Sequence, residues 1–171
     1  MKFPCKTTRL GLLALWIFLP LNGAFAALTD STTFNVKINI DPTCDIKAVS
    51  ASDVDFGSHV HEDTNIDAQG DLTIKCTNGT AYSIGLDNGL HFDNGNTVRQ
   101  MSGTGAGNTG ELIPYTLYLN ANHSTEWTTA SPLSGTGTGQ NEVKAIYGQV
   151  ANLTNAKAGQ YLDTVTATVT Y

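Results

Sequence analysis

Apolar and polar residues alternate with a period of two along much of the chain, which is the pattern of a β-strand that buries one face. The apolar positions of the clearest segments are Phe34, Val36, Ile38 and Ile40; Leu72, Ile74 and Cys76; Tyr82, Ile84 and Leu86; Ile113, Tyr115, Leu117 and Leu119; and Val165, Ala167, Val169 and Tyr171. Clusters rich in Asn, Asp and Gly separate these segments and indicate turns. The sequence therefore predicts an all-β, antiparallel sandwich or barrel, and it requires no helix after residue 26.

The first 26 residues have the three parts of a secretory signal peptide. Three basic residues come first, an apolar stretch from Leu10 to Leu21 follows, and Ala24-Phe25-Ala26 provides small residues at a cleavage site. The apolar stretch of about 12 residues is too short for a stable membrane anchor. A buried N-terminal helix is the alternative. We expect residues 1–26 to be a signal peptide and the mature protein to be exported.

Export changes how the cysteines are interpreted. Cys5 lies in the expected signal peptide, which leaves Cys44 and Cys76 in an oxidising compartment, where pairing is the default. A catalytic or metal-binding thiol pair is the alternative, but it lacks C-x-x-C spacing and an adjacent histidine. The sequence therefore predicts a Cys44–Cys76 disulfide. By closing the loop between these residues, it would stabilise the folded state by about 3–4 kcal/mol in a chain-entropy estimate.

Length and charge exclude several classes of protein. The chain has 171 residues, of which 40% are hydrophobic and 14% are charged, so one folded domain is expected. Its formal net charge is −6, and removal of the three basic residues of the signal peptide takes it to −9. Such an acidic chain does not suit sequence-independent binding of nucleic acid. No G-x-S-x-G motif places a nucleophile beside a base, so no catalytic residues are expected.

A short histidine motif leaves one chemical question open. His59 and His61 flank Val60, and Glu62 and Asp63 follow. Two imidazoles two residues apart on a strand share a face and could hold a zinc or copper ion. A solvated loop without a metal explains the same residues, because no third histidine lies nearby.

Several short motifs, each unspecific alone, occur in order along nearly all of the mature chain. They are Asp41-Pro42-Thr43-Cys44, Val54-Asp55-Phe56-Gly57-Ser58, residues 70–77, residues 82–86, residues 112–118, Ile146-Tyr147-Gly148 and residues 158–165. In these motifs the chain resembles the spore coat protein U family, whose domain is shared by subunits of archaic chaperone–usher pili. The His59-Val60-His61 motif departs from the family pattern.

The resemblance implies an immunoglobulin-like antiparallel β-sandwich that lacks its final strand and is completed by donor-strand complementation. Residues 27–43 would be a donor-strand extension and residues 44–171 the pilin domain. The implied donor anchors are Phe34, Val36, Ile38 and Ile40, and the implied groove-lining strand carries Val165, Ala167, Val169 and Tyr171. The implied function is that of a structural pilus subunit, with a role in adhesion and biofilm formation at the cell surface. Its partners would be copies of itself or sister subunits, a periplasmic chaperone and an outer-membrane usher, without nucleic acid, metal or cofactor.

Two other functions remain open at the level of sequence. A self-contained spore-coat or outer-envelope protein would use residues 34–40 as the first strand of its own sandwich. A secreted carbohydrate-binding module or small enzyme would use Trp127 and the Gly-rich loops, although Trp127 is more simply interpreted as a core aromatic. A single domain with an N-terminal extension favours a shaft or adaptor subunit over a two-domain tip adhesin, without deciding between shaft and adaptor.

Overall fold

The computed structural model describes residues 28–171, and residues 47–52 by their backbone alone. The expected signal peptide, residues 1–26, lies outside the described residues. The chain divides into two units between Ile38 and Asn39. Residues 28–43 form no strand, and their side chains are exposed.

All regular secondary structure of residues 28–171 is β-strand, as the sequence predicts. The strands are β1 (Cys44–Ser52), β2 (Thr64–Cys76), β3 (Ala81–Leu86), β4 (Phe92–Asp93), β5 (Val98–Gly103), β6 (Leu112–Tyr118), β7 (Leu133–Thr136), β8 (Glu142–Asn152), β9 (Tyr161–Leu162) and β10 (Ala167–Thr170). No helix in the described part of the chain is long and apolar enough to cross a membrane.

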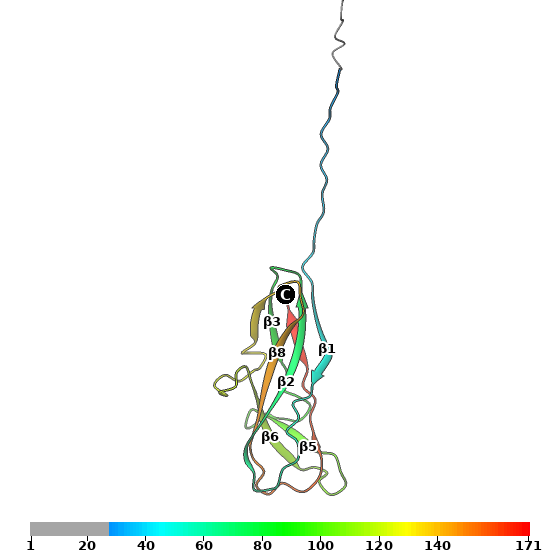
Figure 1. Cartoon of the computed structure of the whole chain (residues 1–171). Helices are drawn as coiled ribbons and strands as arrows, with labels where there is room; N and C mark the ends of the chain where they lie inside the picture. Colours follow the sequence, from blue (N-terminus) through cyan, green and yellow to red (C-terminus); the bar gives the residue numbers. More distant parts are fainter. Residues whose placement is uncertain (1–27) are drawn as a thin grey trace, which may run out of the picture. The chain divides into compact units, whose positions relative to one another are not determined.

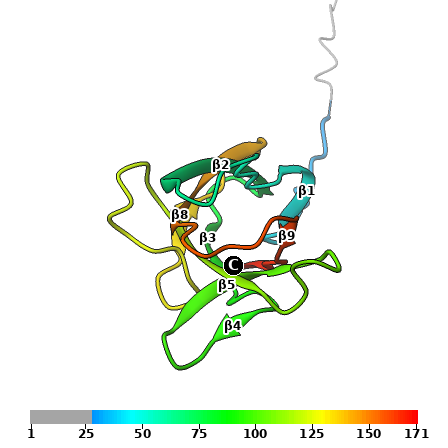
Figure 2. The ribbon, with the colours of Figure 1, turned by 90° about the horizontal axis from the view of Figure 1, so that it is seen from below.

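The strands of residues 39–171 form two sheets (Figure 1). The larger sheet has seven strands in the order β1-β2-β8-β6-β5-β4, with β9 paired to β5, and the smaller sheet has the order β10-β3-β7. The pairings are antiparallel, and the longest ladder joins β2 to β8 from Thr64↔Asn152 to Ile74↔Glu142. The edge strands β1 and β10 lie on the same side of the body in both views (Figures 1 and 2).

The inward side chains of both sheets form one hydrophobic core. Its buried members are Ile66, Leu72, Ile74, Cys76, Tyr82, Ile84, Leu86, Ile113, Tyr115, Leu117, Trp127, Ile146 and Val150. Trp127 is fully buried, and its indole N–H donates a hydrogen bond of 2.8 Å to the carbonyl oxygen of Ile84. Trp127 is therefore a core residue, and it offers no exposed ring on which a sugar could stack.

The segments with clear alternation have two different outcomes. Residues 72–76, 82–86 and 113–118 lie in β2, β3 and β6, and the last segment forms the shorter strand β10. Residues 34–40 alternate just as clearly but form no strand. A strand is stable only when its backbone groups and its apolar face have partners, and residues 34–40 are exposed.

Candidate functional site

An apolar groove of about 1220 Å³ lies in the body, and its walls continue from the edge strands of the two sheets. Its floor is made of apolar side chains from β2, β5, β6 and β8, most of which also belong to the core. They include Ile66, Leu72, Met101, Ile113, Tyr115, Leu117, Ile146 and Val150. One wall is residues 53–61, which follow β1, and the other is residues 156–167, which lead into β10. The groove therefore lies where a further strand would join the two sheets.

The first wall presents apolar side chains inward and carboxylates outward. Val54 and Phe56 are half-buried and pack against the core, whereas Asp53 and Asp55 are exposed. Residues 53–60 lie outside every strand. Gly148 of β8 lies directly beneath this wall, because a Cβ added there would be 2.5 Å from Cγ1 of Val54 and 2.9 Å from Cζ of Phe56. The missing side chain of Gly148 lets the wall pack close to β8.

The second wall is anchored to the body along one edge. The strand β10 pairs with β3 and with no other described strand. Just before it, the amide of Asp87 donates to the carbonyl of Thr166 at 3.0 Å, and the amide of Thr166 donates to the Asp87 carboxylate at 2.8 Å. Burial raises the pKa of Asp87, but hydrogen bonds from the backbone of Thr166 and Gly89 outweigh it and hold this pKa below its ordinary value. Asp87 thus stays ionised at neutral pH and anchors this wall.

A buried carboxylate holds the same wall from within. The side chain of Asp163 is 2% exposed, and it accepts hydrogen bonds from the backbone N–H of Leu90 at 2.9 Å and the Tyr115 hydroxyl at 2.6 Å. The Nδ1 atom of His91 lies 3.0 Å from the same carboxylate. Burial and the bond to Asp163 raise the pKa of Tyr115, so its hydroxyl stays protonated and donates. Gly89 makes room for Asp163, because an added Cβ would overlap its Oδ2 atom.

The histidine motif is part of the first wall. Nε2 of His59 lies 2.6 Å from the carbonyl oxygen of Phe56, and Nδ1 lies 2.9 Å from the Asp63 carboxylate. Both of these partners are acceptors, so the doubly protonated imidazolium fits the geometry best. The hydrogen bond to Asp63, and then the bond to Phe56, raise the pKa of His59. His61 also lines the groove, and no three metal-ligating side chains come together among residues that the structure describes.

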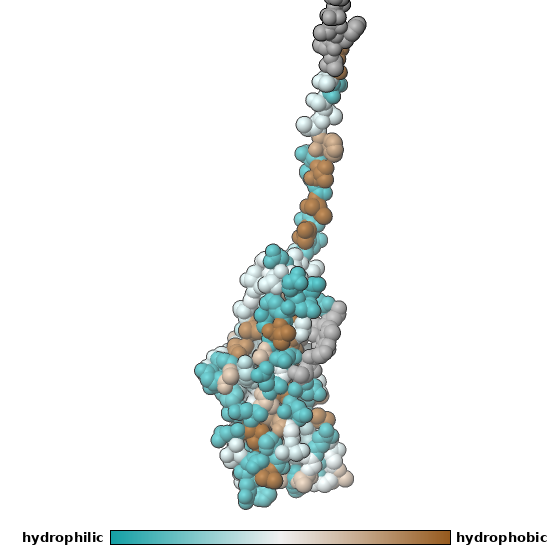
Figure 3. Space-filling view, viewed as in Figure 1, coloured by the Kyte–Doolittle hydropathy of each residue, from teal (hydrophilic) through white to brown (hydrophobic). Residues whose placement is uncertain are grey.

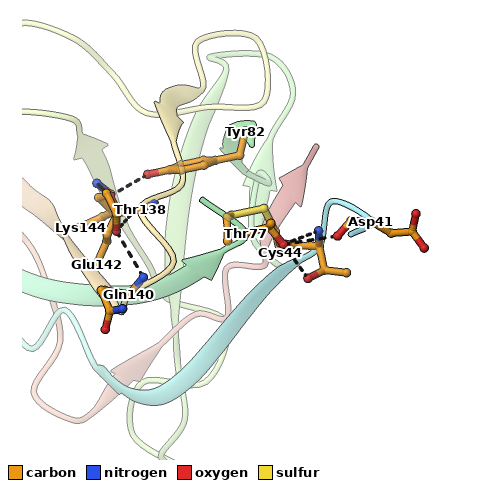
Figure 4. The surroundings of a disulfide bond; sticks show 10 residues. Asp41, Cys44, Thr77, Tyr82, Thr138, Gln140, Glu142 and Lys144 are labelled. Atoms are coloured by element: carbon orange, nitrogen blue, oxygen red, sulfur yellow. Dashed lines mark hydrogen bonds and ion pairs between the residues drawn. A yellow bond between two sulfur atoms is a disulfide. The ribbon is translucent and has the colours of Figure 1, made fainter. Parts of the chain in front are cut away.

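The predicted disulfide joins the start of β1 to the end of β2 (Figure 4). Cys44 and Cys76 are direct partners in the ladder. Beyond them, the amide of Thr77 donates to the carbonyl of Thr43 at 2.9 Å, and the amide of Thr43 donates to the Thr77 hydroxyl at 3.1 Å. The disulfide and these bonds hold the edge strand at the point where the N-terminal extension joins the body.

The structure places the remaining predicted site residues differently. Of the C-terminal strand, Val165 and Ala167 line the groove, Val169 packs against the core, and Tyr171 is 59% exposed beyond the end of β10. The expected donor anchors Phe34, Val36, Ile38 and Ile40 are 72–88% exposed. Hydrophobic and hydrophilic residues alternate visibly along the segment that holds them (Figure 3).

Two features of the groove were not predicted as site residues from the sequence. The alternation of Asp53, Val54, Asp55 and Phe56 is the signal that could have identified the first wall. Asp163 carried no such signal, because its partners come from residues 90–115, far away in the sequence.

Three comparisons bear on the fold. A family model described as the Spore Coat Protein U domain matches residues 30–168. Protein U of Myxococcus xanthus is 28% identical over 158 residues, which cover 85% of this chain and 87% of that protein. A chain in the crystal structure of the CsuC–CsuE chaperone–tip adhesion subunit pre-assembly complex, from archaic chaperone–usher Csu pili of Acinetobacter baumannii, is similar with a TM-score of 0.57 and 24% identity.

The match to the solved structure covers 77% of this chain and 40% of the solved chain. Less than half of the solved chain thus has a counterpart here. The likeness shows a shared fold, and with the two antiparallel sheets it supports the expected immunoglobulin-like sandwich.

Proposed function

We propose that this chain, which belongs to the spore coat protein U domain family, is a structural subunit of a surface fibre assembled by donor-strand exchange. The proposal rests on one observation: the body has a groove that lacks a strand, and the N-terminal segment has the pattern of a strand that lacks a partner. The body has an apolar groove between two edge strands, and the N-terminal segment has an alternating apolar face with no strand partner. A strand supplied by another molecule would satisfy both.

The energetics support a durable junction. The four anchors Phe34, Val36, Ile38 and Ile40 are 72–88% exposed, so nearly all of their apolar surface is available for burial. At about 1.5–3 kcal/mol for each side chain, their burial contributes roughly 6–12 kcal/mol before the ordering cost of the segment is subtracted. Backbone pairing to the walls adds to this. A junction of this strength would rarely dissociate.

The same groove explains the need for a chaperone. An unfilled groove exposes apolar side chains and sheet edges, which promote aggregation. A periplasmic chaperone would fill it with a strand of its own, and an outer-membrane usher would then exchange that strand for the extension of the next subunit. The fibre would lie on the cell surface and serve adhesion and biofilm formation. The solved structure with the similar fold is a chaperone–subunit complex from a pilus of this class.

Ile38→Arg tests the proposal, because it places a charge where the neighbour's groove is apolar. We expect the chaperone-bound subunit to stay folded and abundant, and we expect no fibre from it. The measurement is the ladder of heat-dissociated multimers on a denaturing gel, compared with the yield of chaperone-bound subunit.

Asn39→Arg is the matched control, because it adds the same charge on the opposite face of the segment and should leave assembly near the wild-type level. If Ile38→Arg unfolds the isolated subunit while the wild-type subunit is stable alone, residues 34–40 form an internal strand. The protein would then be a self-contained coat protein, and the fibre proposal would be wrong.

A further inference from the structure

The outward residues of the two groove walls differ in charge. On the first wall, Asp53 and Asp55 are exposed, and Val54 between them points toward the core. On the second wall, the exposed alternate positions are Thr164 and Thr166, which are neutral. A strand between the walls would therefore have an acidic neighbour on one side and a neutral neighbour on the other.

Two basic side chains of the groove are already engaged elsewhere. Lys157, which lines the second wall, forms an ion pair with Glu111. His59 binds Asp63. Neither of these pairs involves Asp53 or Asp55. The Asp55 Oδ1 atom accepts a hydrogen bond of 2.8 Å from the amide of Gly57, and a carboxylate can accept further bonds, so the two rim carboxylates can take a cation from outside the body.

The extension carries one cation, and it stands at an outward position. With the anchors turned inward, Asn35, Lys37 and Asn39 occupy the opposite face. Lys37 is the single Lys or Arg between residues 28 and 43. Opposite charges at facing positions of neighbouring strands attract, and like charges repel. The extension and the first wall are therefore complementary in charge.

The hydrophobic pattern alone leaves the register of such a strand open. A slip of one residue turns every anchor outward and is excluded, but a slip of two residues keeps the apolar face inward. Val36, Ile38 and Ile40 are so similar that the groove would accept either register. A polar contact at an outward position would narrow the set of registers.

We propose that Lys37 of one copy pairs with Asp53 or Asp55 of the next copy, and that this pair restricts the inserted strand to the registers that place Lys37 beside one of these two carboxylates. The inference rests on the proposed function and makes it more specific, because it identifies a second copy of this chain as the occupant of the groove. A sister subunit that lacks the lysine would insert with less discrimination.

Zero-length crosslinking tests the contact directly. Fibres are assembled from a mixture of ¹⁴N-labelled and ¹⁵N-labelled full-length chains and treated with a carbodiimide, which couples an amine only to a carboxylate in contact with it. We expect mass spectrometry to detect Lys37 joined to Asp53 or Asp55 in mixed-isotope peptides. Lys37→Arg has no amine to couple and must abolish that product. Fibres in which Lys37 couples only to other carboxylates, or to none, would overturn the proposal and leave the proposed function intact.

Charge reversal tests the consequence for assembly. Lys37→Glu should lower incorporation in competition with wild-type subunits by about two- to tenfold. Asp53→Lys or Asp55→Lys alone should restore it in the same chain, whereas Glu62→Lys, an equal charge change in the same loop, should not. Equal restoration by Glu62→Lys would show a non-specific charge effect and overturn the register proposal. Absence of any fibre from the wild-type chain would count against the proposed function itself.

Discussion

Gly148→Ala should displace the first wall of the groove, although it changes no residue of that wall. The added Cβ would lie 2.5 Å from Cγ1 of Val54 and 2.9 Å from Cζ of Phe56, so one of these side chains has to move. Val54 is β-branched and stiff at χ1, which transfers the displacement to its backbone. Overpacking costs about 1–3 kcal/mol, and replacing a strand glycine with alanine returns about 0.5–1 kcal/mol. From the middle of both ranges we expect a net loss of about 1 kcal/mol in the free energy of unfolding.

Guanidinium unfolding of the chain without residues 1–26 measures this loss through the emission of Trp127, which is fully buried. Gly107→Ala is the matched control, because no atom lies within 4 Å of its added Cβ. It should be neutral, or stabilising by up to about 1 kcal/mol. Val54→Ala should relieve the overlap, so the double variant should be more stable than the two single costs predict. Simple additivity, or wild-type stability of Gly148→Ala, would refute the close packing of this wall on β8.

Two further predictions concern the disulfide and the histidine of the first wall. Replacing both Cys44 and Cys76 by serine should lower the free energy of unfolding by about 3–4 kcal/mol, given the sequence separation of 32; two free thiols in the exported protein would contradict the pairing. The pKa of His59 should lie above its ordinary value in an NMR titration, and Asp63→Asn should bring it down. Because the folded pKa is raised, the stabilisation is complete below the unfolded pKa of histidine and is lost as pH rises through the folded pKa. A His59 pKa at or below the ordinary value would show that the imidazolium does not bridge Phe56 and Asp63.

Alternation identified segments of β2, β3, β6 and β10, in which apolar residues occupy successive inward positions. It did not reveal β8, where the inward residues are Ile146, Gly148 and Val150, because the glycine interrupts the apolar series. It could not reveal the role of β5 either, since its buried residue is Arg99. The Arg99 guanidinium donates to the carbonyl oxygens of Asp87 and Trp127, at 2.8 and 2.9 Å. Such partners are known only when the chain is folded.

The groove also shows how far alternation in the sequence can predict the structure. Val165 and Ala167, which alternation places on one face of the C-terminal segment, lie along the groove. Val169 and Tyr171 continue the same alternation, yet neither lines the groove. A period of two shows which face a residue occupies, but not how far along that face the groove extends.

The direction of a strand in the groove depends on whether it comes from the same chain or from another molecule. β2 and β3 are joined by residues 77–80 and run in opposite directions. β1 is antiparallel to β2, and β10 is antiparallel to β3. It follows that β1 and β10 also run in opposite directions (Figure 1). A strand between them must be parallel to one and antiparallel to the other. The chain's own extension, folded back through residues 41–43, could run only antiparallel to β1 and hence parallel to β10. A strand from a second copy can instead run antiparallel to β10 and parallel to β1, so each arrangement has one antiparallel and one parallel pairing. An inserted strand that runs antiparallel to β10 must therefore come from a second molecule, whereas one antiparallel to β1 can come from either source.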